Sequence, residues 1–231
     1  MNRLLTLWII YSSCFGNMTW IYDSSGGALN EADAQNNANI IINTYRASGW
    51  DDSAIAGLLG NIENESGFNP MRQEVGGAGY GLVQWTPKSV LENHCNTLGL
   101  SPYTNGDNQL TCIVAEILSN PSSVNEWYTT AGFINNYRES GATDDMIGVT
   151  GSQFITNEMG WTADKMALMF MVGYERPAYD PNVNHIDRRK ADALKWFEYM
   201  GGIIPPTPTE FKYKIPKPFI MFAVAKKKGM I

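Results

Sequence analysis

The sequence predicts a mainly α-helical (α+β) domain with a small β or loop element after its second helix. Two amphipathic segments lie near the N-terminus, and a glycine-rich aromatic stretch, "GGAGYGLVQW", follows the second one at once. The chain has 231 residues, of which 44% are apolar and 12% aromatic, enough to build one well-packed domain.

Residues 30–45 form the first predicted helix. Asn30 can cap its N-terminus, and Asp33 falls in the first turn, where an acidic residue suits the helix dipole. The apolar residues recur at helical spacing, and Ser48 and Gly49 end the pattern. The stripe consists of Ala38, Ile41, Ile42 and Tyr45.

The second predicted helix begins at Asp51 or Asp52 and ends in the sequence "ESGFNP". Gly67 and Pro70 are the terminating residues. Residues 71–87 are rich in glycine, which is typical of a loop or a small hairpin. The apolar stripe of this helix consists of Ile55, Leu58, Leu59 and Ile62.

Helical patterns return further along the chain and divide it into three parts. We expect helices near 88–98, 108–119, 126–138, from Thr162 to a point before Pro177, and over 186–200. The predicted parts are an N-terminal segment (1–29), a helical domain (30–202), and a proline-rich linker with a basic tail (203–231).

The first 17 residues allow three interpretations. One arginine followed by an apolar run resembles a weak signal peptide, but a buried strand or helix would look the same. Met18 could also be the true start. The run is too short for a stable membrane span.

Charge and composition exclude several classes of function. The net charge is −6, and without the six lysines and one glutamate from Glu210 onward it is −11, which disfavours nucleic acid as a partner. Three cysteines without metal-like spacing and only two histidines predict neither a disulfide framework nor a metal site. No cofactor is implied.

Glu65 is the strongest candidate for a catalytic group. It lies on the last turn of the second helix, beside the Leu58 and Ile62 edge of the apolar stripe. A carboxyl there is partly removed from water, which favours the proton-carrying form that a general acid needs. In the following loop, Tyr80 and Trp85 offer flat faces suited to sugar rings.

The sequence "ESGFNP" followed by "GYGLVQW" resembles the phage tail-associated lysozyme family. This family belongs to the lysozyme-like superfamily, which includes the lytic transglycosylases. The resemblance extends to the opening pair of helices, to "WTP" at 85–87 and to "GYERPAYD" at 173–180, and it covers residues 20–202.

The resemblance implies a muramidase that cleaves the β-1,4 bond between N-acetylmuramic acid and N-acetylglucosamine in peptidoglycan. Glu65 would be the catalytic acid. It further implies a phage tail lysin acting at the cell wall, with other tail proteins as partners. The implied lining of the saccharide cleft is Gly81, Leu82 and Gln84, to which the aromatic argument adds Tyr80 and Trp85.

The second carboxylate remains open in the sequence. Glu74 is the best candidate because it lies on the loop and can face the cleft, while Glu63 lies on the wrong side of the helix. Glu116 is read as an exposed helix residue or a hydrogen-bonding partner. Glu175 and Arg176, in the Glu-Arg-Pro element, are interpreted as a structural clamp rather than as substrate contacts. A transglycosylase would need no second acid.

Two other classes of function are alternatives. A cysteine peptidase would need a cysteine and a histidine that meet, and Cys112 with His185 is the pair that could do so. A non-catalytic wall-binding or tail structural module could also retain the fold.

Overall fold

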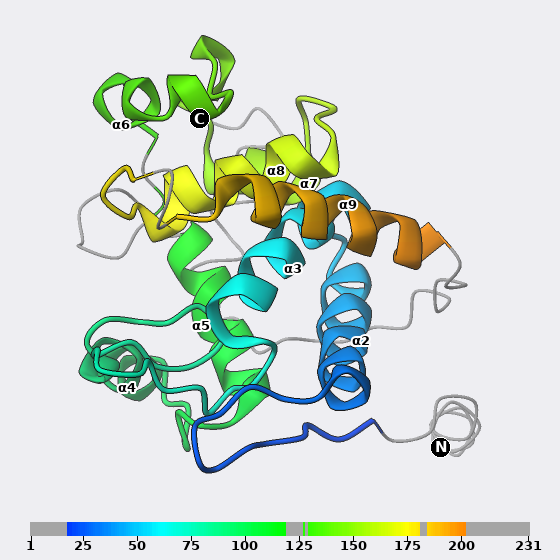
Figure 1. Cartoon of the computed structure of the whole chain (residues 1–231), viewed down its shortest axis with the longest axis vertical. Helices are drawn as coiled ribbons and strands as arrows, with labels where there is room; N and C mark the ends of the chain where they lie inside the picture. The colour runs from blue at the N-terminus through cyan, green and yellow to red at the C-terminus, as the bar shows by residue number, and fades with distance from the viewer. Residues whose placement is uncertain (1–17, 119–126, 128, 181–183, 202–231) are drawn as a thin grey trace, which may run out of the picture.

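The computed structural model describes residues 18–118, 127, 129–180 and 184–201 (Figure 1). Within these residues the chain is mainly α-helical, as the sequence predicts. The α-helices are α2 (Glu31–Ala47), α3 (Asp52–Ser66), α4 (Lys88–Thr97), α5 (Gly106–Leu118), α6 (Ala131–Asn136), α7 (Gly151–Thr156), α8 (Ala163–Phe170) and α9 (Ile186–Gly201). Short 3₁₀ turns η1 (Arg138–Ser140) and η2 (Asp144–Met146) follow α6, and a π-helical turn, η3 (Met171–Glu175), extends α8.

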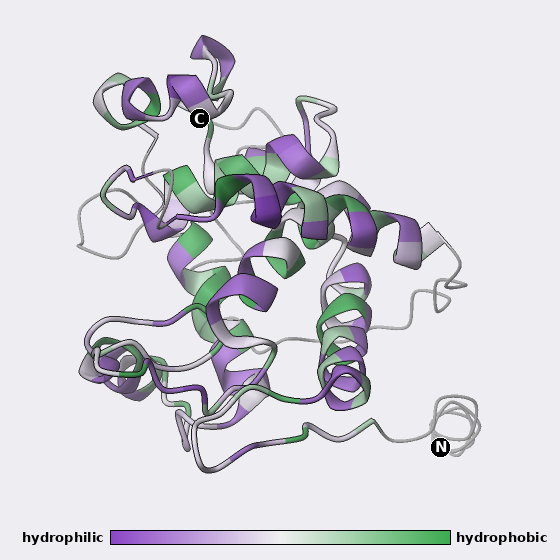
Figure 2. Ribbon diagram, viewed as in Figure 1, coloured by the Kyte–Doolittle hydropathy of each residue, from purple (hydrophilic) through white to green (hydrophobic). Residues whose placement is uncertain are grey.

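Helix α3 lies at the centre of the molecule, with α8 and α9 packed along it and α2 beside it (Figure 1). Its predicted apolar stripe is fully buried. Hydrophobic residues are prominent in α5 and α8 and alternate with polar ones in α3, and residues of all three helices belong to the core (Figure 2). Burial of this stripe, rather than helix propensity, therefore stabilises α3.

Two glycines let the neighbouring helices touch the backbone of α3. A Cβ on Gly60 would lie 2.4 Å from the carbonyl oxygen of Arg189 in α9. A Cβ on Gly57 would lie 2.7 Å from the carbonyl carbon of Met166 in α8. Both approaches are too close for any side chain, so these positions set the distance between α3 and its partners.

The predicted helix boundaries are largely confirmed. The Asn30 side chain accepts a hydrogen bond from the backbone N–H of Asp33, and Asp51 caps α3. Gly67 ends α3 in the left-handed conformation, with φ of 56°. Thr162 is the N-cap residue of α8, without a side-chain hydrogen bond.

The structure differs from the prediction in two helical segments. Where a helix is expected over 126–138, the described residues form the short α6, which Thr130 precedes and Tyr137 ends. The 3₁₀ turn η1 follows and ends at Gly141 in the left-handed region. Helix α7 was not predicted. Its six residues are too few for an apolar periodicity, and its sequence signal is the capping box of Thr150 and Gln153.

The element after α3 is a loop rather than a hairpin of regular strands. Among the described residues its β character is limited to isolated antiparallel bridges, Gln73 with Tyr80 and Tyr80 with Trp85. Glycines at positive φ, such as Gly76 and Gly81, turn the chain too often for strands to extend.

Residues 18–29 run along the surface of the helical domain. The Asn37 side chain hydrogen-bonds both the N–H and the carbonyl of Ile21, and the Asn69 side chain does the same for Asp23. The segment 1–17 and the predicted linker and tail from 203 onward lie outside the described residues. Of the helices that are described, none combines the length and apolar character that crossing a bilayer requires.

Candidate active site

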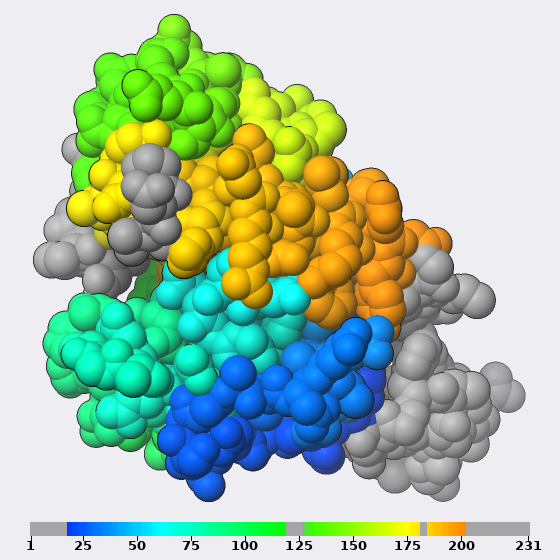
Figure 3. Space-filling view, in the orientation of Figure 1, coloured from blue at the N-terminus to red at the C-terminus, as the bar shows by residue number. Residues whose placement is uncertain are grey.

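An open cleft of about 670 Å³ lies between the C-terminal end of α3, the loop after it, α5 and the residues around η3. Figure 3 shows a hollow where the cyan of α3, the blue-green of residues near α4 and the yellow of residues near 175–180 approach one another. Its walls carry four carboxyl groups, those of Glu65, Glu74, Glu116 and Glu175. This concentration of acids is the main chemical feature of the cleft.

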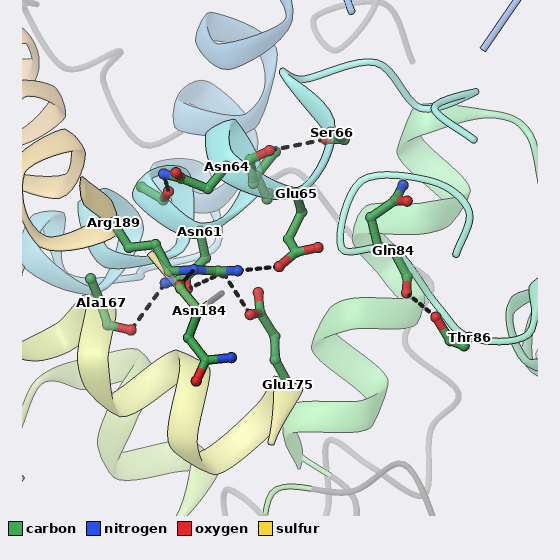
Figure 4. Close-up of polar contacts among 12 residues, drawn as sticks. Asn61, Asn64, Glu65, Ser66, Gln84, Thr86, Ala167, Glu175, Asn184 and Arg189 are labelled. Atoms are coloured by element: carbon green, nitrogen blue, oxygen red, sulfur yellow. Dashed lines mark hydrogen bonds and ion pairs between the residues drawn. The ribbon is translucent and has the colours of Figure 1, made fainter. Parts of the chain in front are cut away.

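Glu65 projects from the last turn of α3 toward the cleft, as the sequence predicts (Figure 4). Its side chain is 21% exposed, so it is reachable yet mostly surrounded by protein. The left-handed turn at Gly67 carries the chain away, and another helical turn would occupy the space next to the carboxyl.

Arg189, on α9, joins Glu65 to a second acid, Glu175. Its Nη2 donates to Oε1 of Glu65, and its Nη1 donates to Oε2 of Glu175 at 2.7 Å (Figure 4). Nη1 also donates to the side chain of Asn61 at 2.8 Å, and Nε donates to the carbonyl of Asn184 at 2.9 Å. These bonds fix the guanidinium, which is 8% exposed, and through it both carboxyls.

Glu175 ends η3, and its side chain is 8% exposed. Burial raises the pKa of its carboxyl to about 8, an effect that Arg189 opposes and the nearby Glu65 reinforces. Its Oε1 is buried without a hydrogen-bond partner among the described residues. Both Glu175 and Arg176, which the sequence analysis interprets as a structural clamp, line the cleft. The ion pair of Glu175 with Arg189 ties the end of η3 to α9.

Glu116 organises the inner wall of the cleft. Both of its carboxylate oxygens accept from the indole N–H of Trp85 at 3.1 Å, and Oε1 lies 2.7 Å from Nδ1 of His94. The hydroxyl of Tyr174 donates to Oε2, and burial raises the pKa of this tyrosine well above its ordinary value. Since Glu116 is only 3% exposed, it is the hydrogen-bonding partner that the sequence allowed, not an exposed residue.

The predicted saccharide-binding residues separate into two groups. Gln84 and Trp85 line the cleft, and Gln84 lies on the loop that faces Glu65 (Figure 4). Tyr80, Gly81 and Leu82 are buried behind that surface. The N–H of Leu82 donates to the side chain of Gln109, so this stretch anchors the loop to α5.

Glu74 is exposed at the rim of the same cleft. Its Oε2 accepts from the backbone N–H of Gly79 at 3.0 Å, and its own N–H donates to the Gly79 carbonyl. The carboxyl therefore closes its loop while one oxygen stays available. Cys95 and Cys112 are buried, with their sulfur atoms 2.8 Å apart, and neither lines the cleft.

A helical domain that presents an acid at a helix end, over an open cleft lined by carboxyls, defines the lysozyme-like class. The family model described as phage tail lysozyme matches residues 36–200, and the chain belongs to this family. Morphogenesis protein 1 of Bacillus phage B103 is 30% identical over 171 residues, which cover 72% of this chain and 40% of that protein. The chain thus spans two-fifths of that relative's length. The family is one of phage-associated, lysozyme-like cell-wall enzymes.

Proposed function

We propose that this chain cleaves the β-1,4 bond between N-acetylmuramic acid and N-acetylglucosamine in peptidoglycan, with Glu65 as the general acid. The observation that carries the proposal is the position of Glu65. It stands at the end of α3, held by Arg189 and facing an open cleft, in a chain of the phage tail lysozyme family. The virion tail is the proposed site of action. The family description, phage tail lysozyme, supports it, and the relative is a morphogenesis protein of a phage.

The chemistry requires one proton at the glycosidic oxygen. Glu65 would protonate this oxygen as the bond to the anomeric carbon breaks, and the positive charge that develops on the sugar would be stabilised by the carboxylates of the cleft. Gln84 and Trp85 would contact the sugar rings, since both line the same cleft as Glu65.

Replacement of Glu65 by glutamine tests this role. The amide keeps an oxygen for Arg189 but has no transferable proton, so Glu65→Gln should lose at least about 10²-fold in rate, since general acid catalysis contributes roughly 10²–10⁴. The measurement is turbidity clearing of purified cell walls, with circular dichroism as the check on folding.

Glu63→Gln is the matched control, because Glu63 lies on the same helix and pairs with Lys195 at 2.6 Å. It should clear walls at close to the wild-type rate. A folded Glu65→Gln protein within threefold of wild type would contradict the glycosidase proposal and favour a peptidase. If the wild-type protein binds walls but does not clear them, the non-catalytic module is the better description.

Glu74 is the proposed second carboxylate, positioned to orient water or to stabilise positive charge. Glu74→Gln should lower wall cleavage by about tenfold or more, within the range of acid–base contributions. Because Glu74 also closes its loop, the folding check is the binding of purified glycan fragments, which should persist. A near-normal rate would assign the role to another acid or to the substrate itself.

The nature of the product distinguishes the two reactions open to this site. A hydrolase leaves a reducing end on N-acetylmuramic acid, whereas a lytic transglycosylase closes an anhydro ring on it. Mass spectrometry of the released glycans separates these products by the mass of one water. We propose the hydrolase, and an anhydro product would replace it with the transglycosylase.

A further inference from the structure

The carboxyl groups of Glu65 and Glu175 both pair with the guanidinium of Arg189 at the cleft. Arg189 donates to Glu65 with one nitrogen and to Glu175 with the other, and both contacts are ion pairs. Two ionised carboxylates and one guanidinium would leave a net charge of −1 in a region where Arg189 and Glu175 are each 8% exposed. An uncompensated charge in such surroundings is costly, and the cluster can remove it by keeping one proton.

The geometry also shows where that proton fits. Oε2 of Glu175 accepts a hydrogen bond from Arg189, while Oε1 is buried and has no hydrogen-bond partner in the described part of the chain. Figure 4 shows this second oxygen pointing toward the carboxyl of Glu65. Two ionised carboxylates have no donor to offer each other, but a single proton between them satisfies the orphaned oxygen.

We propose that Glu175 and Glu65 share one proton above the guanidinium of Arg189, and that Glu175 is the positioning residue that keeps this proton available to Glu65. The inference rests on the proposed function, in which Glu65 is the acid. The burial that raises the pKa of Glu175 to about 8 supports it, because a pair with that value retains the proton at neutral pH.

The shared proton explains how Glu65 can act as an acid although it pairs with an arginine. A general acid next to a fixed arginine would lose its proton too readily, since the cation stabilises the carboxylate. With Glu175 present, Arg189 faces two carboxyls, and one can remain neutral. In the reaction the proton leaves Glu65 with the glycosidic oxygen, which becomes the leaving hydroxyl. A proton from the attacking water, or from the substrate hydroxyl in a transglycosylase, then restores the pair.

Other ionisable groups face the pair from each neighbouring element. Tyr137 interacts electrostatically with Glu175, and burial raises the pKa of this tyrosine to about 12, so it stays neutral in the relevant range. The remaining groups lie on the cleft walls, at the loop, on α5 and after η3, and they are Arg72, Glu74, Glu116, Tyr174 and Arg176. Arg189 donates a hydrogen bond to each of the two carboxyls.

The first test is the pH profile of Glu175→Gln, which keeps size and hydrogen bonding but cannot share a carboxylic proton. Arg189 then faces Glu65 alone, and the proton leaves at lower pH. We expect the alkaline limb of kcat on soluble glycan to move down by at least one pH unit. At pH 7, kcat should fall about tenfold or more while KM stays near wild type. If Glu175 has only a structural role, the alkaline limb of the kcat profile stays at the wild-type pH, and that result overturns the proposal. Glu63→Gln is the control that should not move the limb.

The second test needs no activity. In protein labelled with ¹³C at the glutamate side-chain carboxyl, wild type should show one carboxyl titrating near pH 8, and this signal should be lost in Glu175→Gln. If all carboxyls of the wild type ionise below pH 5, proton sharing is wrong. If sharing is seen but Glu65→Gln remains active, the proposed function fails while the shared proton stands.

Discussion

At the scale of residues, the environment of Glu175 has a consequence for the stability of the fold. Its carboxyl carries a raised pKa in the folded protein, whereas the unfolded chain releases the proton near 4.5. The folded state therefore binds this proton more tightly. The stability it provides is fully present below about pH 4.5 and is lost as the pH rises through about 8.

We expect the melting temperature of the wild type to fall by several degrees between pH 5 and pH 9, at about 2–4 °C per kcal/mol for a domain of this size. Glu175→Gln should lose most of that decline, because its amide does not titrate. Differential scanning calorimetry of both proteins across the range measures the difference. Parallel curves for the two proteins would mean that Glu175 ionises in the folded state as it does in the unfolded one.

At the scale of elements, the site depends on how closely α9 approaches α3. Gly60 meets the carbonyl of Arg189 and the backbone N–H of Ala193, and no side chain fits between them. The side-chain oxygen of Asn61, the next residue, accepts a hydrogen bond from Arg189. Its side-chain NH₂ donates to the carbonyls of Gly57 and Ala167. The close contact between α3 and α9 therefore also places Arg189 beside Glu65.

Gly60→Ala should destabilise the protein by about 1–3 kcal/mol, because the added methyl would lie 2.4 Å from the Arg189 carbonyl and must push α9 away. This range is the net effect, since a clash with the rigid backbone of α9 costs more than the gain of about 1 kcal/mol in helix propensity. Wall clearing should fall as well, since Arg189 moves with α9.

Gly132→Ala is the control for this variant, because Gly132 lies in α6 and an added Cβ meets nothing within 4 Å. It should be neutral or slightly stabilising in urea unfolding. A Gly60→Ala protein as stable as this control would show that α9 is free to shift without cost.

At the scale of the whole molecule, the cleft lies between two groups of elements. Helices α3 and α9 with η3 supply Glu65, Arg189 and Glu175, while the loop after α3 and α5 supply Gln84, Trp85 and Glu116. The loop is tied to α5 by the Gln109 side chain, which bonds Leu82 and the carbonyl of Pro70. These hydrogen bonds hold the loop in place on the far side of the open cleft from the end of α3.

The sequence by itself determined the helical class, the caps of α2 and α3, and the place of Glu65, because periodicity, capping and chain termination act over a few neighbouring residues. Glycine-rich patterning likewise located the facing loop. Tertiary structure alone decided the partners of Glu65. Arg189 lies 124 positions away in a run of basic residues that looks like a solvated helix face. The sequence left Glu116 open as an exposed residue or a hydrogen-bonding partner, and its contacts with Trp85, His94 and Tyr174 decide for the second. Burial and charge pairing between distant segments arise only when α3, α5 and α9 pack, so no local pattern can encode them.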